Sequence, residues 1–278
     1  MQPVEAIDNS SHVNEAFSRQ SLHYDADDLQ NPLLHDMRVQ VYHHVSKFLT
    51  QPSHILELNS GTGIDALYFA QQGHKVHATD LSDGMIEQIK TKINYFHLQD
   101  RLSVRQLSYD QLDRLKGHKF DFVFSNFGGL NCIDDLTRVT KHLQSILNPG
   151  GFVTWVIMPP FCLWEILSIL KGNRNAFRRF NKNGIVAHLE GKHFKVWYHS
   201  LSFIKKSFGS DFKLVHHEGL AALSPPPHVT QFPIKHPLLY NALKKMDSSL
   251  RNNFPFNRWA DHIIVTFQYF PKGNDLAR

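Results

Sequence analysis

The residues that most constrain this chain run from Ile55 to Asp80. An apolar segment, Ile55-Leu56-Glu57-Leu58, leads into the turn Asn59-Ser60-Gly61-Thr62-Gly63, and a second apolar segment ends at Asp80. A glycine-rich turn between a strand and a helix lets the backbone approach a ligand closely, and a carboxylate at the end of the next strand suits the two hydroxyls of a ribose. The pattern predicts the first half of a nucleotide-cofactor site.

Apolar segments and helical patterns alternate through the first half of the chain. We expect strands at 54–59, 75–80, 102–107, 120–126 and 151–158, and helices between them that begin near Ile64, Ser82 and Asp134. Strands alternating with helices at this spacing predict an α/β fold with a parallel, doubly wound sheet. Ahead of it, Asn31 and Pro32 supply an N-cap and a first-turn proline, so residues 1–50 are predicted to form an N-terminal helical extension.

The alternation stops after residue 158. We expect helices at 161–170, 201–208 and 237–250, and two further strands at 211–217 and 262–270. The stretch 151–170 has the length of a membrane span, but Pro159, Pro160 and Glu165 interrupt it. A buried strand followed by an amphipathic helix is the better interpretation, and no stable membrane insertion is expected.

Charge and cysteine content narrow the class of protein only slightly. The formal net charge is +5, and the one notable basic cluster contains Lys171, Arg174, Arg178, Arg179 and Lys182. Cys132 and Cys162 lie 30 residues apart, which gives neither a disulfide framework nor a zinc motif. A reducing compartment, and therefore a cytoplasmic location, is the expectation.

The turn alone leaves two cofactor classes open. Gly61 to Ala66 satisfies the pattern G-x-G-x-x-G/A, which admits a nicotinamide-dependent oxidoreductase. Three features favour S-adenosylmethionine instead: Glu57 lies four residues before Gly61, the strand 120–126 begins acidic and ends polar, and Leu147-Asn148-Pro149-Gly150-Gly151 leads directly into a strand. These residues resemble the class I S-adenosylmethionine-dependent methyltransferases, in the group that acts on small molecules. The first motif of that family resembles E-L-G-C-G-T-G and here reads Glu-Leu-Asn-Ser-Gly-Thr-Gly.

The resemblance covers residues 54–158 well and implies an organisation for the whole chain. It implies a Rossmann-like sheet of seven strands whose last strand is antiparallel, with 211–217 and 262–270 as the closing pair. Residues 1–50 would fold over the cofactor, and 51–158 would bind it. Residues 159–206 would form a lid that covers the acceptor, and 207–278 would hold the closing strands with an inserted helix.

The resemblance also assigns cofactor-binding roles to individual residues. Asn59, Ser60, Gly61 and Gly63 would form the turn beneath the cofactor, with Asn59 in a strained conformation where the family has glycine. Asp80 would bind the ribose hydroxyls, Leu81 and Met85 would flank the adenine ring, and Glu57 would fix the turn or meet the cofactor amine. Tyr24 would face the sulfonium, and Arg38 would pair with the methionine carboxylate. Asn126 would face the cofactor or the acceptor. Ser108 occupies the position of an acidic residue that meets the adenine amino group. Ser108, Asp110 or backbone groups alone would recognise adenine, and the sequence leaves these three open.

The acceptor is expected to be a small, apolar or aromatic molecule because residues 159–206 are rich in large apolar groups. O-methylation is the first expectation, while C- or N-methylation of a specialised metabolite or lipid, and a non-catalytic cofactor-binding protein, stay open. His199 is a weak candidate for a general base. No metal is expected, because no His pair has a third ligand at a suitable spacing. Ser125-Asn126-Phe127-Gly128 departs from the Asn/Asp-Pro-Pro-aromatic motif of nucleic-acid amino methyltransferases, so no nucleic-acid partner is expected. A homodimer is one assembly that the apolar lid would allow.

Overall fold

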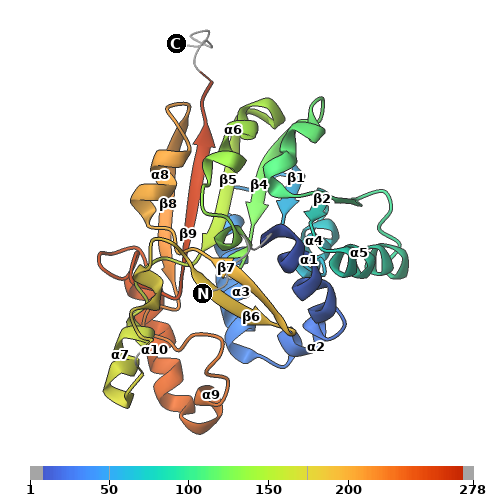
Figure 1. The fold of residues 1–278 in the computed structure, drawn as a ribbon. Helices are drawn as coiled ribbons and strands as arrows, with labels where there is room; N and C mark the ends of the chain where they lie inside the picture. Colours follow the sequence, from blue (N-terminus) through green and yellow to red (C-terminus); the bar gives the residue numbers. More distant parts are fainter. Residues whose placement is uncertain (1–8, 50, 174, 272–278) are drawn as a thin grey trace, which may run out of the picture.

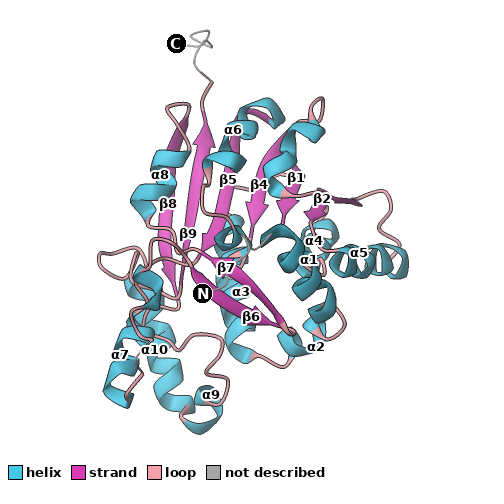
Figure 2. Ribbon diagram, viewed as in Figure 1, coloured by secondary structure: helices cyan, strands magenta, loops and turns pink. Residues whose placement is uncertain are grey.

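The computed structural model describes residues 9–49, 51–173 and 175–271, and a seven-stranded sheet forms its centre (Figures 1 and 2). The strand order is β3-β2-β1-β4-β5-β9-β8. In chain order the strands are β1 His54–Leu58, β2 Lys75–Asp80, β3 Leu102–Gln106, β4 Phe120–Ser125, β5 Leu147–Ile157, β8 Phe212–Leu220 and β9 His262–Tyr269. The neighbouring pairs among β1 to β5 are parallel, whereas β9 is antiparallel to both β5 and β8. The predicted seven-stranded sheet with an antiparallel last strand is confirmed.

Helices cover both faces of the sheet, as a doubly wound fold requires. The helices α3 Pro32–Val45, α4 Ile64–Gln71 and α5 Asp83–Tyr95 cover one face, and η1 Tyr109–Leu115, α6 Thr137–Ile146 and α8 Leu201–Ser207 cover the other. In β1, Leu56 and Leu58 pack toward the second group while Ile55 packs toward the first. Burial on both faces explains why these strands contain apolar runs rather than a polar alternation.

Three helices precede the sheet: α1 Asn9–Gln20, α2 Tyr24–Leu29 and α3. The predicted cap of α3 is present, because the Asn31 side chain accepts hydrogen bonds from the backbone N–H groups of Leu33 and Leu34, and Pro32 occupies the first turn. The short helix η2 Gly129–Cys132 follows β4.

A β-hairpin that the sequence analysis did not predict lies over α1. It consists of β6 Ile185–Leu189 and β7 Lys192–Val196, and its central residues Glu190 and Gly191 have φ of 49° and 76°. Positive φ at both central positions is typical of the tight turns that join twisted strands. We call α1 together with this hairpin the cap.

The remaining helices gather beside the sheet, in a part of the molecule that we call the side lobe (residues 159–184 and 221–261; Figure 1). It contains α7 Leu163–Leu167, η3 Ser168–Lys171, η4 Arg178–Phe180, α9 Phe232–Lys235 and α10 Pro237–Leu250. Buried Arg179 joins its two segments, because it pairs with Glu165 at 2.8 Å and with Asp261 at 2.7 Å. The expected insertion 159–206 therefore divides into a lobe segment, the hairpin of the cap and α8, which packs on the sheet. None of the helices in the described residues is both long and apolar enough for a membrane span.

Candidate active site

A cavity of about 280 Å³ lies at the carboxyl edge of the parallel strands. Residues that follow five strands line it, namely Asn59, Leu81, Leu107, Asn126 and Met158. Ligands of open α/β sheets bind at this edge because the connecting loops diverge there. Of the residues expected to bind a cofactor, nine line the cavity: Tyr24, Arg38, Asn59, Ser60, Gly61, Asp80, Leu81, Met85 and Asn126.

The glycine-rich turn forms the floor of the cavity. Gly61 has φ of 56°, and a Cβ added there would meet no atom within 4 Å, so this side of the turn is open to a ligand. Asn59 has φ of 45°, the left-handed conformation expected for it, and its side chain accepts a hydrogen bond from Ser125 Oγ at 2.8 Å. Gly63 does not line the cavity; it caps α4 with φ of 81°, and a Cβ there would lie 2.9 Å from Ile89. Its role is to bring α4 and α5 together.

Asp80 closes the turn from the end of β2. Its carboxylate accepts hydrogen bonds from the backbone N–H of Gly61 at 2.9 Å and of Ser82 at 2.8 Å. Burial raises the pKa of Asp80 to about 6, although these backbone N–H groups oppose the shift. The carboxylate therefore faces the cavity in a fixed orientation and is ionised at neutral pH.

Arg38 lies at the cavity wall, but its charge is already paired. Its terminal nitrogens donate to Asp65 at 2.5 Å and to Asp28 at 2.6 Å. Burial alone would lower the pKa of Arg38, but the two carboxylates raise it. Its Nε is buried and has no hydrogen-bond partner among the described residues. Each terminal nitrogen also carries a second N–H, so Nε and these two groups are the donors that remain for the expected contact with a methionine carboxylate.

Asp65 is the residue at this site that the sequence analysis missed. Besides Arg38, it accepts hydrogen bonds from Tyr42 Oη at 2.6 Å and from Asn126 Nδ2 at 2.9 Å. Asn126 thereby turns toward the acidic group rather than projecting freely. Two carboxylates around one guanidinium leave this end of the cavity with a net negative charge, which suits a cationic ligand.

Glu57 lies behind the turn and does not line the cavity. It is 1% exposed, and burial together with neighbouring Asp65 raises its pKa well above the ordinary value. Its Oε2 has no hydrogen-bond partner among the described residues. A direct contact between Glu57 and a cofactor amine would require this oxygen to reach past the turn.

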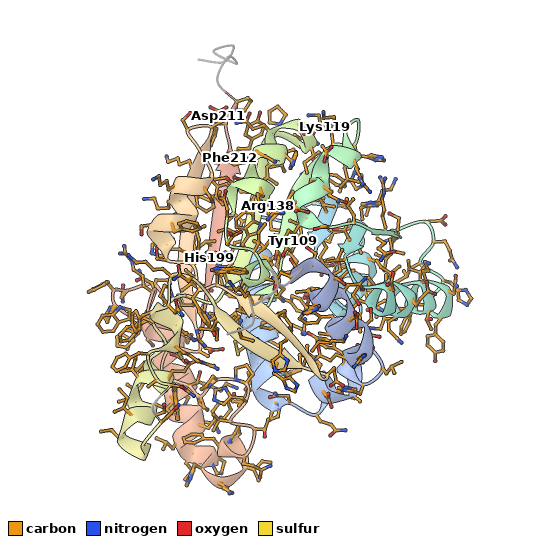
Figure 3. All side chains as sticks on the ribbon, viewed as in Figure 1. Tyr109, Lys119, Arg138, His199, Asp211 and Phe212 are labelled. Atoms are coloured by element: carbon orange, nitrogen blue, oxygen red, sulfur yellow. The ribbon has the colours of Figure 1, made fainter. Side chains whose placement is uncertain are left out.

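The opposite end of the cavity contains Leu81, Met85, Leu107 and Tyr109, which could enclose a flat ring. Ser108 does not line this cavity; it lines a smaller neighbouring one of about 220 Å³. Asp110 is paired with Arg138 of α6, which Figure 3 labels beside Tyr109. Neither of the two side chains expected to recognise adenine, Ser108 or Asp110, therefore reaches into the main cavity.

The cap supplies an apolar wall that the sequence analysis located only in part. Val13 and Phe17 come from α1, and Ala187, Phe194 and Val196 come from the hairpin. Asn9 of α1 joins the helix to the hairpin, because its side chain donates to the carbonyl of Lys195 at 3.2 Å and accepts from the N–H of Lys195 at 2.6 Å. The alternation of apolar residues in 185–196 around Glu-Gly was the available signal for this hairpin.

His199 lies outside the cavity, so the structure does not place it as a base. It is 3% exposed, its Nε2 donates to the carbonyl of Ile133 at 2.9 Å, and its ring stacks on Phe203. Burial lowers the pKa of His199, and the residue joins η2 to the start of α8. Figure 3 labels it on the ribbon.

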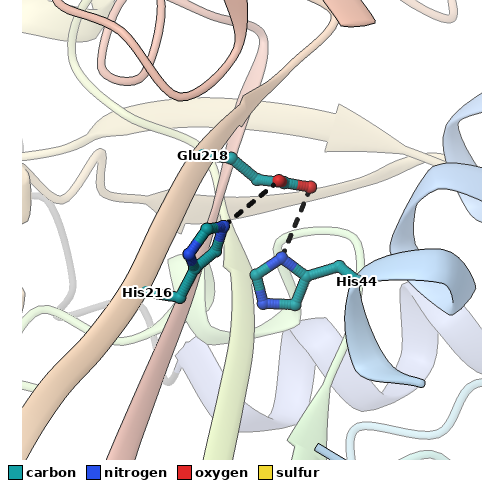
Figure 4. A group of neighbouring side chains, drawn as sticks. All are labelled: His44, His216 and Glu218. Carbon is teal, nitrogen blue, oxygen red and sulfur yellow. Dashed lines mark hydrogen bonds and ion pairs between the residues drawn. The ribbon is translucent and has the colours of Figure 1, made fainter. Parts of the chain in front are cut away.

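A second polar cluster contains the one group of His and carboxylate side chains, among the described residues, with atoms close enough to hold a metal ion. Glu218 lies 3.3 Å from His44 Nδ1 and 3.4 Å from His216 Nε2 (Figure 4). Two cations face the same carboxylate, Arg251 at 3.5 Å and Lys47 at 4.0 Å, whereas burial lowers the pKa of His44. Burial would raise the pKa of Glu218, but His44, Arg251 and Lys47 lower it to about 2. Because cations already surround Glu218, we interpret the cluster as an ion-pair network that ties α3 to β8.

The residues at the cavity fit S-adenosylmethionine. The open side of Gly61 gives room for the cofactor backbone, and Asp80 presents a carboxylate of the kind that binds ribose hydroxyls. The unpartnered Nε of Arg38 is a donor for a carboxylate, and the acidic surroundings of Asp65 suit the sulfonium and ammonium charges.

Comparisons with known proteins point the same way. Residues 55–151 match the model of a family described as a methyltransferase domain. No curated protein matches the chain in sequence. Solved structures match in fold. One is the 1,6-didemethyltoxoflavin-N1-methyltransferase of Burkholderia thailandensis with bound 1,6-didemethyltoxoflavin and S-adenosylhomocysteine. It is 14% identical, with a TM-score of 0.56, and the match covers 94% of this chain and 89% of that one.

Two further structures share the fold at the same identity. A putative S-adenosylmethionine-dependent methyltransferase from Listeria monocytogenes, 14% identical, gives a TM-score of 0.54 over 83% of this chain and 98% of that one. A putative sarcosine dimethylglycine methyltransferase from Galdieria sulphuraria, 14% identical, gives 0.54 over 86% and 85%. Residues 55–151 thus match a methyltransferase domain, and the chain shares its fold with S-adenosylmethionine-dependent methyltransferases of known structure.

Proposed function

We propose that this enzyme methylates a small, apolar or aromatic acceptor, with the oxygen of an acidic hydroxyl as its first target. The observation that carries the proposal is the apolar wall of the cavity, built by Val13, Phe17, Met158, Phe194 and Val196. Such a wall binds an acceptor by removing its apolar surface from water. It offers few partners for a highly polar substrate.

The titratable side chains of the cavity narrow the kind of acceptor. Asp65 and Asp80 hold the hydrogen bonds described above, and burial raises the pKa of Cys132 to about 12 and that of Tyr109 well above its ordinary value. Among the described lining residues there is also no His or Lys. Asp80 has a raised pKa, but its carboxylate is held by the N–H groups of Gly61 and Ser82 and would bind the ribose, so it is not free to take a proton from the acceptor. The acceptor must therefore supply its own nucleophile. A phenol or enol of low pKa does so, and a neutral amine is the alternative.

When bound, S-adenosylmethionine supplies a methyl group on an electrophilic sulfonium. The protein would contribute position and exclusion of water. Asp80 would accept hydrogen bonds from the ribose, Arg38 Nε would donate to the carboxylate, and the Tyr24 ring would face the sulfonium as a cation–π partner. Burial raises the pKa of Tyr24 to about 12, so its phenol stays protonated.

The test uses matched acceptors that share one aromatic skeleton. Full-length enzyme is incubated with methyl-deuterated S-adenosylmethionine and a phenol, the corresponding aniline or the corresponding benzylic alcohol, and the products are identified by mass spectrometry. We expect the phenol to be methylated on oxygen and the benzylic alcohol to stay unmodified. Faster methylation of the aniline would replace O- by N-methylation. Equal rates for phenol and benzylic alcohol would contradict the absence of a base.

A further inference from the structure

The side lobe carries a continuous strip of five aromatic rings, of which four are exposed and Phe161 is half-buried. Phe177 contacts Phe180 at 6.1 Å between ring centroids, Phe180 contacts Phe161 at 6.0 Å, and Phe161 stacks on Trp259 at 4.4 Å. Trp259 in turn contacts Phe254 at 5.9 Å. Phe254 is 69% exposed and Phe177 is 59% exposed. We call these five residues the aromatic strip, and an exposed apolar surface of this kind marks an interaction site.

Exposed aliphatic side chains extend the apolar character of the side lobe. Leu170 beside α7 and Leu238 at the start of α10 are each 85% exposed, and Ile234 of α9 is 68% exposed. The lobe contains eleven of the twenty large apolar residues that are exposed in the described part of the chain, although it comprises only about a quarter of the described residues. This concentration is confined to the lobe and is separate from the methyl-transfer cavity.

The charge of the chain is concentrated in the same place. The two lobe segments contain ten basic and three acidic residues, whereas the rest of the chain contains 20 basic and 22 acidic ones. All three acidic residues, Glu165, Asp247 and Asp261, are buried. Arg178 and Lys182 are exposed near the strip, and the Arg258 guanidinium lies 5.8 Å from the Phe254 ring. The solvent-exposed surface of the side lobe therefore combines cationic side chains with apolar ones.

We propose that the side lobe docks on an anionic membrane surface and holds the enzyme there peripherally. Aromatic rings and basic side chains together favour the boundary between lipid headgroups and acyl chains, where rings enter and cations stay at the surface. A second copy of the chain would bring one cationic lobe against another. A nucleic acid would pair with the cations but would leave the exposed leucines without an apolar partner. The helices α7, α9 and α10 lie beside the sheet, so the side lobe could dock on a membrane without any separation of the sheet strands (Figure 1).

The test is co-sedimentation of the full chain with phosphatidylcholine vesicles that contain or lack phosphatidylglycerol. We expect binding only with phosphatidylglycerol. The double variant Phe177→Ser with Phe254→Ser should partition at least about tenfold less well, because two rings no longer enter the interface. The double variant Leu29→Ser with Tyr95→Ser removes two apolar side chains elsewhere that are even more exposed, 86% and 76%, and should bind like the wild type.

Charge is tested separately with Lys182→Gln and Arg258→Gln, each of which removes one cation. Each removed cation should weaken vesicle binding by roughly fivefold at low salt. No binding to phosphatidylglycerol vesicles, or equal loss in both double variants, would overturn the proposal. The proposal would also be overturned if the protein bound heparin with the same affinity as vesicles and the Phe177→Ser/Phe254→Ser variant bound heparin unchanged. Calorimetric binding of S-adenosylmethionine should be the same in all variants, which separates this proposal from the methyltransferase assignment.

Discussion

Replacing Asp80 by alanine tests the cofactor site most directly. The carboxylate is fixed by the backbone N–H groups of Gly61 and Ser82 and faces the cavity. Two ribose hydroxyls that donate to it would each contribute about 1.5–3 kcal/mol, the range for hydrogen bonds to a charged group. Taking the lower figure for both gives about 3 kcal/mol, so Asp80→Ala should weaken S-adenosylmethionine binding by roughly a hundredfold.

The same substitution should change stability much less than binding. It removes a buried carboxylate whose raised pKa shows that its charge is costly, and this relief offsets part of the loss. Of the two N–H groups that it frees, that of Gly61 lies beside the open cavity and that of Ser82 is buried. Calorimetry therefore measures the affinity while thermal unfolding checks that the fold is intact. Asp83→Asn is the matched control, since Asp83 lies three residues further on, exposed at the first turn of α5. If Asp80→Ala binds within about threefold of both the wild type and the control, Asp80 does not hold the ribose.

Three further predictions concern pH, an ion pair and a histidine. The folded pKa of Asp80 is raised from 3.8 to about 6, so its ionisation lowers the stability of the fold as pH rises through this interval. The affinity for S-adenosylmethionine should instead fall as pH drops below about 6, because the carboxylate becomes protonated. Calorimetric titrations at successive pH values should show this inflection in the wild type and not in Asp80→Asn. Arg38→Met leaves Asp65 buried without its cation, so urea unfolding should show a loss of about 3–5 kcal/mol, and a loss below about 1 kcal/mol would refute the buried pair. His199→Ala removes the bond to Ile133 and should cost about 1–3 kcal/mol of stability without moving the pH profile of methyl transfer; a lost inflection in that profile would make His199 a catalytic group.

The sequence predicts those parts of the fold that depend on local patterns. The central strands of the sheet are buried on both faces and flanked by turn residues, and each predicted strand is present, with ends shifted by a few residues. The helix predicted at 237–250 matches α10, where Pro237 marks the first turn. The hairpin at 185–196 was missed because its strands pair only with each other and pack on α1, far away in sequence. Its Glu-Gly turn was the one local signal.

The candidate site divides in the same way. The turn, Asp80 and Asn126 follow strands, so their common position at the sheet edge could be inferred from sequence. The ion-pair partners of Arg38 could not be inferred in this way. Asp28 and Asp65 lie on two other helices, and the sequence pattern around an arginine does not identify its partner. Ser108 faces a neighbouring cavity because the chain turns away into η1 directly after it.

The composition of the cap has a kinetic consequence. Under the proposed function, spent cofactor and product would be enclosed on one side by α1 and the hairpin, whose shared core is small and has Ala16, Phe194 and Val196 as its buried residues. The surrounding contacts, such as those of Asn9 and Arg19, are exposed hydrogen bonds that water can replace. Separating these two elements costs far less than disrupting the seven-stranded sheet, so we expect exchange to proceed through local opening of the cap. The rate of that opening, rather than the strength of the methyl donor, would then set the pace of each catalytic cycle.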